Sequence, residues 1–254
     1  MIKPPIEIEK MREAGRLTAK VLEALDGIII PGVTTLEIDA FCERFITETL
    51  EARPASKGQY DYPYSINTSI NQVVCHGMPS DKPLKKGDII NVDVTVEKNG
   101  FIGDSSKMFC VGEVSSHAKR LVDVTQQCLY EGIKTVKPGA SLGDIGHAIQ
   151  TYAEKHHYSV VREFSGHGIG REMHEAPQVL HYGKRGEGLV LQAGMTFTIE
   201  PMINQGKRHV KTLKDGWTVI TVDRRLSAQW EHTILVTPDG CDILTLRKEE
   251  SILA

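Results

Sequence analysis

The stretch from Ile89 to Phe109, I-I-N-V-D-V-T-V-E-K-N-G-F-I-G-D-S-S-K-M-F, decides the fold predicted for this chain. Its first half alternates valines with polar residues, which is the pattern of a β-strand. Asn99-Gly100 is the strongest short signal for a two-residue hairpin turn, so residues 101–109 are predicted to return as the partner strand. The chain is therefore expected to contain a long β-hairpin.

The register of this hairpin brings two carboxylates together. If Asn99-Gly100 form the turn, Asp104 faces Thr95, and Asp93 becomes its diagonal neighbour on the same face. Two carboxylates held this close repel each other unless one is protonated or a cation lies between them. The alternative is a pair of solvated acids, but the flanking valines indicate burial and favour a metal site.

The composition is that of an ordinary globular protein, with 254 residues, 40% of them hydrophobic and 25% charged. A net charge of -3 gives no overall attraction to nucleic acid or anionic membranes, so any basic site must be local. The five cysteines are scattered without C-x-x-C spacing and indicate reduced thiols. The acidic N-terminus and the absence of a long apolar run predict a cytoplasmic protein with no membrane segment, by default a monomer.

The second half of the chain repeats the plan of the first. Two helices are expected at 8–25 and 34–50, the second opened by a Thr34/Glu37 capping box. Landmarks then recur 107 positions later: Pro31-Gly32 at 138–139, Gly87 at 194, and Asp93 at Glu200. We predict one catalytic domain, 1–254, with pseudo-symmetric halves at about 8–110 and 116–250, which brings Asp93 and Glu200 to one cleft. The alternative is that two unrelated segments happen to have turn residues at similar positions. Residues 51–67 are expected to be an irregular surface segment.

Three further residues complete a candidate metal-binding set. His167 has a glycine on either side, which leaves its imidazole accessible as a ligand. Glu200 ends an apolar strand predicted at 194–201, and Glu231 lies within a strand predicted at 227–236. Buried glutamates are rare without a partner. Four carboxylates and one imidazole suit Mn²⁺, Fe²⁺, Co²⁺ or Zn²⁺, and two divalent ions would balance the charge.

These motifs resemble the type I methionine aminopeptidases of peptidase family M24 across nearly the whole chain. The matching stretches are M-R-E-A-G-R from Met11, N-x-V-V-C-H-G from Asn71, D-V-T-V-x-x-x-G-F-x-G-D from Asp93, S-G-H-G-I-G from Ser165, F-T-I-E-P from Phe197 and S-A-Q-x-E-H-T from Ser227. The resemblance implies an α/β pita-bread fold with an internal repeat. It also implies that Asp104 and Glu231 bridge two divalent metal ions, while Asp93 holds one ion and His167 with Glu200 the other.

The activity that the resemblance implies is removal of the N-terminal methionine from nascent polypeptides whose second residue is small. Water activated by the metal ions would attack the first peptide bond. Glu200 would carry a proton to the leaving amine, His174 would steady the carbonyl oxygen, and His76 would contact the amide nitrogen.

The methionine pocket departs from the family pattern. Tyr62, His76, His174 and Trp217 occupy expected substrate-binding positions. Ser56 and Asn67 stand where many bacterial relatives have cysteines, Gln59 replaces an aromatic residue, and Met173 replaces a phenylalanine. These changes predict a more polar and more pliable pocket whose strictness for methionine differs from that of the family.

Two weaker predictions concern other partners. Lys207, Arg208, Lys211 and Lys214 form a basic loop that the resemblance assigns to ribosomal RNA, the alternative being a solvated charged hairpin. Carbonyls near Asn71 and Val73, together with Ser227, resemble the family's monovalent-cation site.

Three alternatives share part of this pattern. A proline-directed relative, such as an X-Pro aminopeptidase or prolidase, has the same fold and ligands but usually an additional N-terminal domain. A non-catalytic pita-bread binding module typically loses metal ligands, whereas all five are present here. A dimetal phosphoesterase would need a phosphate cradle or arginine clamp, which the sequence lacks. The identity of the metal, the strictness of the pocket and the oligomeric state are left open by the sequence.

Overall fold

A computed structural model describes the backbone of residues 1–253 and the side chains of residues 1–250. The helices are α1 (Pro5–Ala24), α2 (Thr35–Arg44), α3 (Ser116–Ile133) and α4 (Leu142–Lys155), with short helical turns η1 (Phe45–Thr49), η2 (Gln59–Asp61) and η3 (Lys248–Leu253). The strands are β1 (Arg53–Pro54), β2 (Ile66–Ile70), β3 (Val73–Cys75), β4 (Ile89–Lys98), β5 (Phe101–Cys110), β6 (Ser159–Val160), β7 (Gly166–Gly168), β8 (Glu175–Val179), β9 (Thr196–Ile199), β10 (Met202–Asn204), β11 (Val210–Thr212), β12 (Val219–Thr221), β13 (Ser227–Gln229), β14 (His232–Val236) and β15 (Cys241–Ile243).

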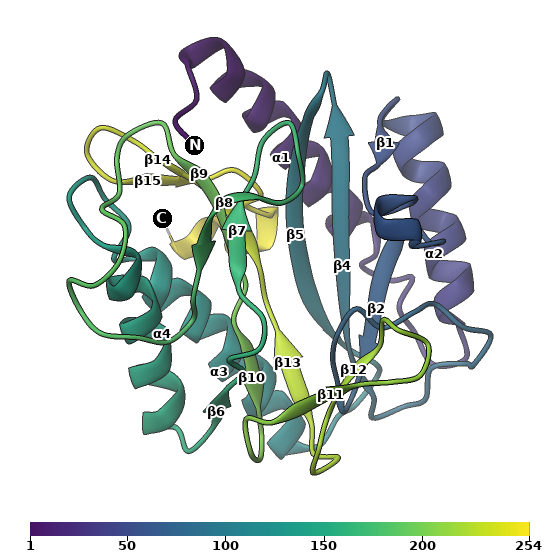
Figure 1. Cartoon of the computed structure of the whole chain (residues 1–254). Helices are drawn as coiled ribbons and strands as arrows, with labels where there is room; N and C mark the ends of the chain where they lie inside the picture. The colour runs from purple at the N-terminus through teal and green to yellow at the C-terminus, as the bar shows by residue number, and fades with distance from the viewer. Residues whose placement is uncertain (254) are drawn as a thin grey trace.

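The predicted hairpin is confirmed in its register. β4 pairs antiparallel with β5, and Thr95 faces Asp104 while Asp93 faces Ser106. The two turn residues have positive φ angles, 54° at Asn99 and 76° at Gly100, which is the backbone that a two-residue hairpin turn of matching twist requires. β4 pairs along one edge with β5, and its other edge pairs with β1 near the hairpin turn and with β2 further along (Figure 1).

The second large sheet has the order β15-β14-β9-β7-β8. Here the prediction of one continuous strand over 227–236 is wrong. β13 pairs with β10, whereas β14 pairs with β9 and β15, so the chain changes sheets at Trp230 and Glu231. This change of partner lifts Glu231 out of regular strand pairing and leaves its side chain at the junction of two sheets.

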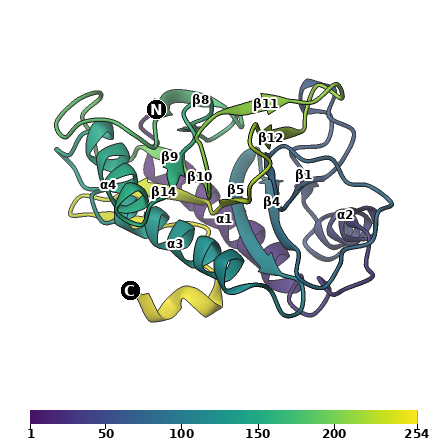
Figure 2. The ribbon, with the colours of Figure 1, turned by 90° about the horizontal axis from the view of Figure 1, so that it is seen from below.

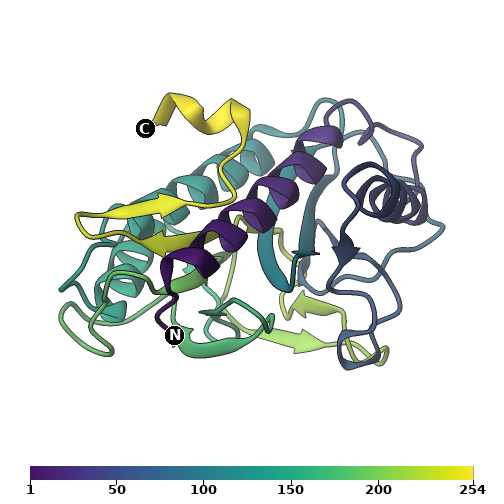
Figure 3. The same cartoon turned by 90° about the horizontal axis from the view of Figure 1, so that it is seen from above.

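The helices cover one side of the strands. In Figure 2, α1 and α3 lie on one side and β11 and β12 on the other, and Figure 3 shows the C-terminal segment on the helical side. α1 packs directly on β5, because a Cβ placed on Gly103 would lie 2.7 Å from the backbone of Ala14. The hydroxyl of Thr18 donates to the Gly103 carbonyl at 3.0 Å and closes this contact. α1 is thereby held against the strand that carries Asp104.

The internal repeat is visible in the hydrogen bonds. The amide of Gly32 donates to Leu84 O at 2.8 Å, and the amide of Gly139, 107 positions further on, donates to Leu191 O at 3.0 Å. α2 and α4 both begin with a capping box, at Thr34 and at Ser141. One buried apolar cluster lies mainly in the first half and a larger one mainly in the second. The repeat is therefore confirmed, while the single-domain organisation stays a prediction.

The segment 51–67 is only in part the irregular surface segment that was expected, because exposed residues alternate in it with buried ones. It contains β1 and the start of β2, both paired with β4, and its side chains Ser56 and Tyr62 are buried. Several of its polar residues line a cavity. Because they are polar, nothing in the sequence indicated that they are buried. No helix in the described part of the chain is long and apolar enough to cross a bilayer.

Candidate metal centre

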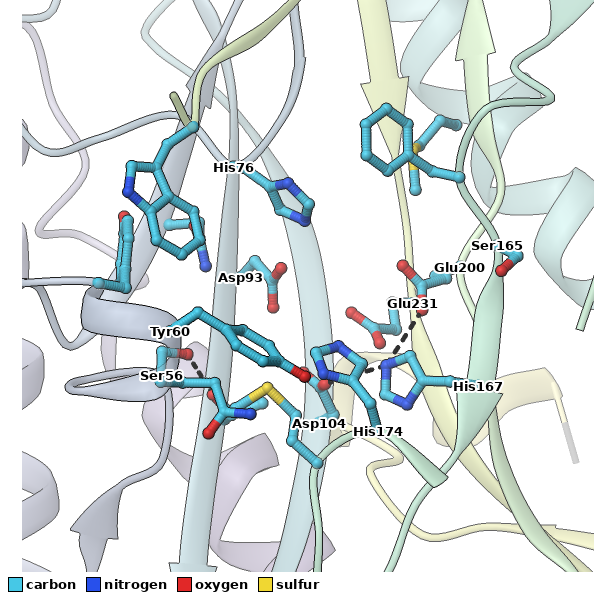
Figure 4. Close-up of a pocket in the computed structure, with 18 of the residues that line it drawn as sticks. Ser56, Tyr60, His76, Asp93, Asp104, Ser165, His167, His174, Glu200 and Glu231 are labelled. Carbon is cyan, nitrogen blue, oxygen red and sulfur yellow. Dashed lines mark hydrogen bonds and ion pairs between the residues drawn. The ribbon is translucent and has the colours of Figure 1, made fainter. Parts of the chain in front are cut away.

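Five residues from five different segments line one cavity of about 340 Å³ (Figure 4). They are the ones that the sequence predicted: Asp93 on β4, Asp104 on β5, His167 on β7, Glu200 directly after β9, and Glu231 between β13 and β14. The two halves of the repeat thus meet at this cavity, with the Asp pair from the first half and the other three side chains from the second.

The side chains are close enough to share a ligand. Potential ligand atoms of Asp104, His167 and Glu231 all lie within 4.8 Å of one another. His167 Nε2 is 3.7 Å from Asp104 Oδ2 and 3.5 Å from Glu200 Oε1. The Asp93 and Asp104 carboxyl groups lie close enough to influence each other's pKa.

Burial and mutual repulsion make this cluster unfavourable as bare carboxylates. Burial raises the pKa of Asp93 to about 7 and that of Glu200 to about 8. The pKa values of Asp104 and Glu231 are raised well above the ordinary range, first by burial and then by the neighbouring carboxylates. A positive charge at this point would relieve the repulsion.

His167 is oriented as a neutral ligand. Its Nδ1 lies 3.0 Å from the carbonyl oxygen of Gly168, which can only accept, so Nδ1 carries the proton. Burial, and then the nearby His174, lower the pKa of His167 to about 4. The lone pair on Nε2 therefore points at the carboxylates of Asp104 and Glu200, an arrangement that a cation stabilises.

The donor set fits divalent metal ions. Asp104 Oδ1 is buried and has no hydrogen-bond partner among the described residues. An orphaned carboxylate oxygen, an aimed imidazole lone pair and three further carboxylates match the oxygen-rich environment with one nitrogen that such ions take.

A supporting shell around Glu200 was missed in the sequence. Thr198 donates to Glu200 Oε1 at 2.8 Å and accepts from the His167 amide at 3.0 Å. Gln229 Nε2 donates to Glu200 Oε2 at 3.3 Å, and the Glu200 amide donates to His181 Nε2 at 3.0 Å. Thr198 lies two residues before Glu200, on the same strand face, so its role was readable from the spacing. No local signal pointed to His181, which follows β8.

A second supporting group holds Asp104 and Glu231 from behind. Thr233 Oγ1 accepts from the Asp104 amide at 3.1 Å and donates to the Asp104 carbonyl at 2.7 Å. Ser105 Oγ donates to the Glu231 carbonyl at 2.6 Å and accepts from the buried guanidinium of Arg247 at 3.0 Å. Arg247 is thereby linked to the Glu231 backbone through Ser105, while Thr233 on β14 holds the Asp104 backbone.

The two other predicted histidines lie on different sides of the acids (Figure 4). The ring of His174 is 4.4 Å from that of His167 and 6.0 Å from that of Tyr60. His76 follows β3 with a φ of 54° and meets the ring of Phe164 edge-on at 5.4 Å. Burial lowers the pKa of both histidines, that of His76 to about 4 with a contribution from His174.

The predicted pocket residues line the same cavity beside Asp93; they are Ser56, Gln59, Tyr62, Asn67, Met173 and Trp217. The rings of Tyr62 and Trp217 meet edge-on at 4.8 Å. The phenol of Tyr62 donates to Ile66 O at 2.9 Å, which fixes the ring. An aromatic recess therefore adjoins the acidic cluster.

The remaining predicted residues lie outside the cavity. The basic loop leads into the β11–β12 hairpin, with Lys211 in β11, and Arg208 approaches Glu163 at 3.7 Å. Asn71 and Ser227 do come together, the Ser227 amide donating to Asn71 O at 2.9 Å. Val73 lies nearby on β3, which pairs with β12.

Comparisons with known proteins agree with this geometry. Residues 9–238 match the model of metallopeptidase family M24. The methionine aminopeptidase of Escherichia coli K12 is 56% identical over 254 residues, covering 100% of this chain and 96% of that protein. The crystal structure of methionine aminopeptidase from Rickettsia prowazekii superimposes with a TM-score of 0.95 at 53% identity, covering 97% of this chain and 99% of that one.

A more distant neighbour, the prolidase from Pyrococcus furiosus, has a TM-score of 0.78 at 22% identity, covering 97% of this chain and 66% of its own, and shows the shared pita-bread fold alone. Since the nearer matches extend over essentially the full length of both partners, the chain belongs to metallopeptidase family M24 and, within it, to the methionine aminopeptidases.

Proposed function

We propose that this chain removes the N-terminal methionine from nascent polypeptides by metal-dependent hydrolysis. The observation that carries the proposal is the convergence of four carboxylates and the His167 lone pair on one cavity, in a chain 56% identical to a methionine aminopeptidase. An aromatic recess beside the acids suits an unbranched thioether side chain.

The same five residues would hold two divalent ions, with Asp104 and Glu231 shared, Asp93 on one ion, and His167 and Glu200 on the other. Mn²⁺, Fe²⁺, Co²⁺ and Zn²⁺ all suit this donor set. When bound, the ions supply a water of lowered pKa and polarise the scissile carbonyl. The support for the assignment is the fit of the donor atoms described above.

The protein side chains would then handle protons and orientation. Glu200, held by Thr198 and Gln229 at its two oxygens, is oriented to pass a proton from the attacking water to the leaving amine. His174, whose ring lies beside that of His167, would donate to the carbonyl oxygen as it gains negative charge. His76, on the opposite side of the acids, would contact the amide nitrogen.

The assay is release of free methionine from Met-Gly and Met-Leu peptides. Activity should disappear with a chelator and return with at least one of the four divalent ions, and Met-Gly should be preferred. Equal activity after metal removal, or no activity with any ion, would contradict the proposal. Faster cleavage of Met-Pro than of Met-Gly would favour the prolidase-like alternative instead, and stoichiometric peptide binding without turnover would indicate a non-catalytic module.

The same preference has a consequence for the chain itself. Because Ile2 is bulky, the protein should keep its own Met1. Intact-mass spectrometry of protein produced in cells with normal methionine excision tests this, and complete loss of Met1 would show that the second position tolerates large side chains.

We also propose that the chain works in the cytoplasm, where nascent chains emerge from ribosomes, and that it acts as a monomer. The basic loop of Lys207, Arg208, Lys211 and Lys214 has the charge to contact rRNA phosphates. Co-sedimentation with ribosomes should weaken steeply as salt is raised and should be reduced in the Lys211→Glu/Lys214→Glu variant. Co-sedimentation that responds neither to salt nor to the substitutions would exclude this loop as the contact.

A monovalent cation is also proposed near the carbonyls of Asn71 and Val73 with Ser227. The support is the close approach of Ser227 to Asn71 in the structure. Exchanging K⁺ for the bulky tetramethylammonium ion should lower thermal stability if the site is used, and no difference would argue against it.

A further inference from the structure

The recess beside the metal centre has an uncommitted amide in its wall. Asn67 on β2 is paired directly with Asp93 on β4, and both side chains line the cavity. Within the described part of the chain, the Asn67 side chain makes no hydrogen bond. Its two N–H donors are therefore available to whatever enters the recess.

The other hydroxyl groups in this wall are already hydrogen-bonded and do not pair with Asn67. Ser56 and Thr95 hydrogen-bond to one another through their hydroxyls, so one hydroxyl proton is used and the other is left over. The phenol of Tyr62 is already committed to the Ile66 carbonyl. The recess thus combines an aromatic lining from Tyr62 and Trp217 with hydrogen-bond donors of Asn67 that have no partner among the described residues.

A methionine thioether uses such donors poorly. Its sulfur is a weak acceptor, so an unoxidised side chain that excludes water leaves the Asn67 N–H groups without a strong partner. Oxidation of the sulfur to the sulfoxide adds a strong acceptor oxygen at nearly the same shape and length. The chemistry of the wall is therefore better matched to the oxidised side chain.

The charge of the cavity narrows the choice to neutral side chains. Among the described residues that line it there is no lysine or arginine, whereas Asp93, Asp104, Glu163, Glu200 and Glu231 are all present. With two divalent ions balancing the four ligand carboxylates, the Glu163 carboxylate remains, and this lining offers no basic partner to a buried carboxylate side chain. A sulfoxide is dipolar but uncharged, so it avoids this penalty while still accepting a hydrogen bond.

We propose that this enzyme also removes N-terminal methionine sulfoxide, with Asn67 donating to the sulfoxide oxygen. The proposal rests on the function proposed above and extends its substrate class. The reaction is the same hydrolysis: water adds across the first peptide bond, the C–N bond breaks, and the products are free methionine sulfoxide and the shortened peptide. The oxidation state of the sulfur does not change, so no reductant is needed.

The test compares kcat/KM for Met-Gly-Gly-Leu with that for the same peptide carrying each sulfoxide epimer, using metal-loaded enzyme. At least one epimer should be cleaved within tenfold of the unoxidised peptide. Slower cleavage of both epimers overturns the proposal while leaving the methionine activity intact. Absence of cleavage of the unoxidised peptide would instead be a failure of the proposed function.

The role of Asn67 is tested by two substitutions of similar size. Asn67→Leu removes both donors, and Asn67→Asp keeps the shape but presents a carboxylate to the sulfoxide oxygen. The ratio of sulfoxide to methionine kcat/KM should fall about tenfold in Asn67→Leu, equivalent to about 1.4 kcal/mol, and at least as far in Asn67→Asp. A ratio unchanged in either folded variant refutes the assignment of Asn67.

Binding provides a readout that does not depend on turnover. Calorimetric titration with free methionine sulfoxide should show tighter binding to the parent enzyme than to Asn67→Leu, with less difference for free methionine. Equal losses for both ligands would mean that Asn67 only shapes the recess, and would contradict the proposed hydrogen bond.

Discussion

Replacing Arg247 with methionine should destabilise the protein by about 3–5 kcal/mol, the cost of breaking a buried ion pair from one side. The guanidinium is buried and donates to Glu250 Oε1 at 2.6 Å and to Ser105 Oγ at 3.0 Å. Although burial raises it, the hydrogen bond and charge of His232, followed by the charge of Arg247, hold the pKa of Glu250 well below its usual range. Without Arg247, the Glu250 carboxylate would stay buried without its guanidinium partner.

The assay is urea denaturation with a chelator present, so that metal binding does not contribute to the measured free energy. In thermal unfolding the same loss corresponds to a drop of roughly 6–20 °C in Tm. Adding Glu250→Gln to the variant removes the stranded charge, so the double variant should be at least about 1 kcal/mol more stable than the sum of the two single effects predicts.

The matched control is Lys86→Met, which breaks the exposed pair of Lys86 and Glu113, 3.1 Å apart. Its effect should stay within about 0.5 kcal/mol, as for other surface pairs. Two outcomes would contradict the described role of the buried Arg247–Glu250 pair. One is a change in stability of less than about 1 kcal/mol in Arg247→Met, and the other is additivity of Arg247→Met and Glu250→Gln.

Glu231→Gln should weaken binding of divalent ions by at least about 100-fold, which is more than the loss of an outer-shell partner would cause. Dialysis followed by metal analysis tests this, and an affinity equal to that of the parent would contradict it. Gly168→Ala places a Cβ 2.1 Å from the Ala176 carbonyl oxygen, so it should cost about 1–3 kcal/mol and lower metal content, whereas the open site of Gly240→Ala should show neither effect in urea titrations. Burial raises the pKa of Asp39 from 3.8 to about 6 despite two backbone hydrogen bonds, so the folded state binds this proton more tightly than the unfolded state. The free energy of unfolding of the parent relative to Asp39→Asn should therefore fall as the pH rises from 3.8 to about 6 and then level off, and a difference independent of pH would refute this.

Features governed by neighbouring residues were predictable from the sequence. The Asn99-Gly100 turn determines the hairpin register because its positive φ angles come from local backbone preferences, and the register then determines that Asp93 and Asp104 share a face. The capping boxes are equally local, since each joins residues three positions apart. Side-chain chemistry was likewise sufficient to single out Asp93, Asp104, His167, Glu200 and Glu231, which the structure brings to one cavity.

Features governed by contacts between distant segments were not predictable. The break at Trp230 and Glu231 arises because β13 and β14 pair with different strands, which no local pattern records. The burial of Ser56 and Tyr62 follows from pairing of their flanking strands with β4. From the sequence, polar residues that line a cavity are predicted to be on the surface, because the segments that cover them are far away in the chain.

The sequence by itself determined which groups are candidates for the metal centre: an acid pair on a hairpin, an accessible imidazole and two glutamates in apolar surroundings. The tertiary structure decided how they are held. Three of these arrangements join residues far apart in the chain: His181 accepts from the Glu200 amide, Arg247 donates to Ser105, and Asn67 lies opposite Asp93 on the neighbouring strand. The physical reason is that hydrogen-bond partners of buried groups are selected by packing, and packing is settled only when all segments are in place.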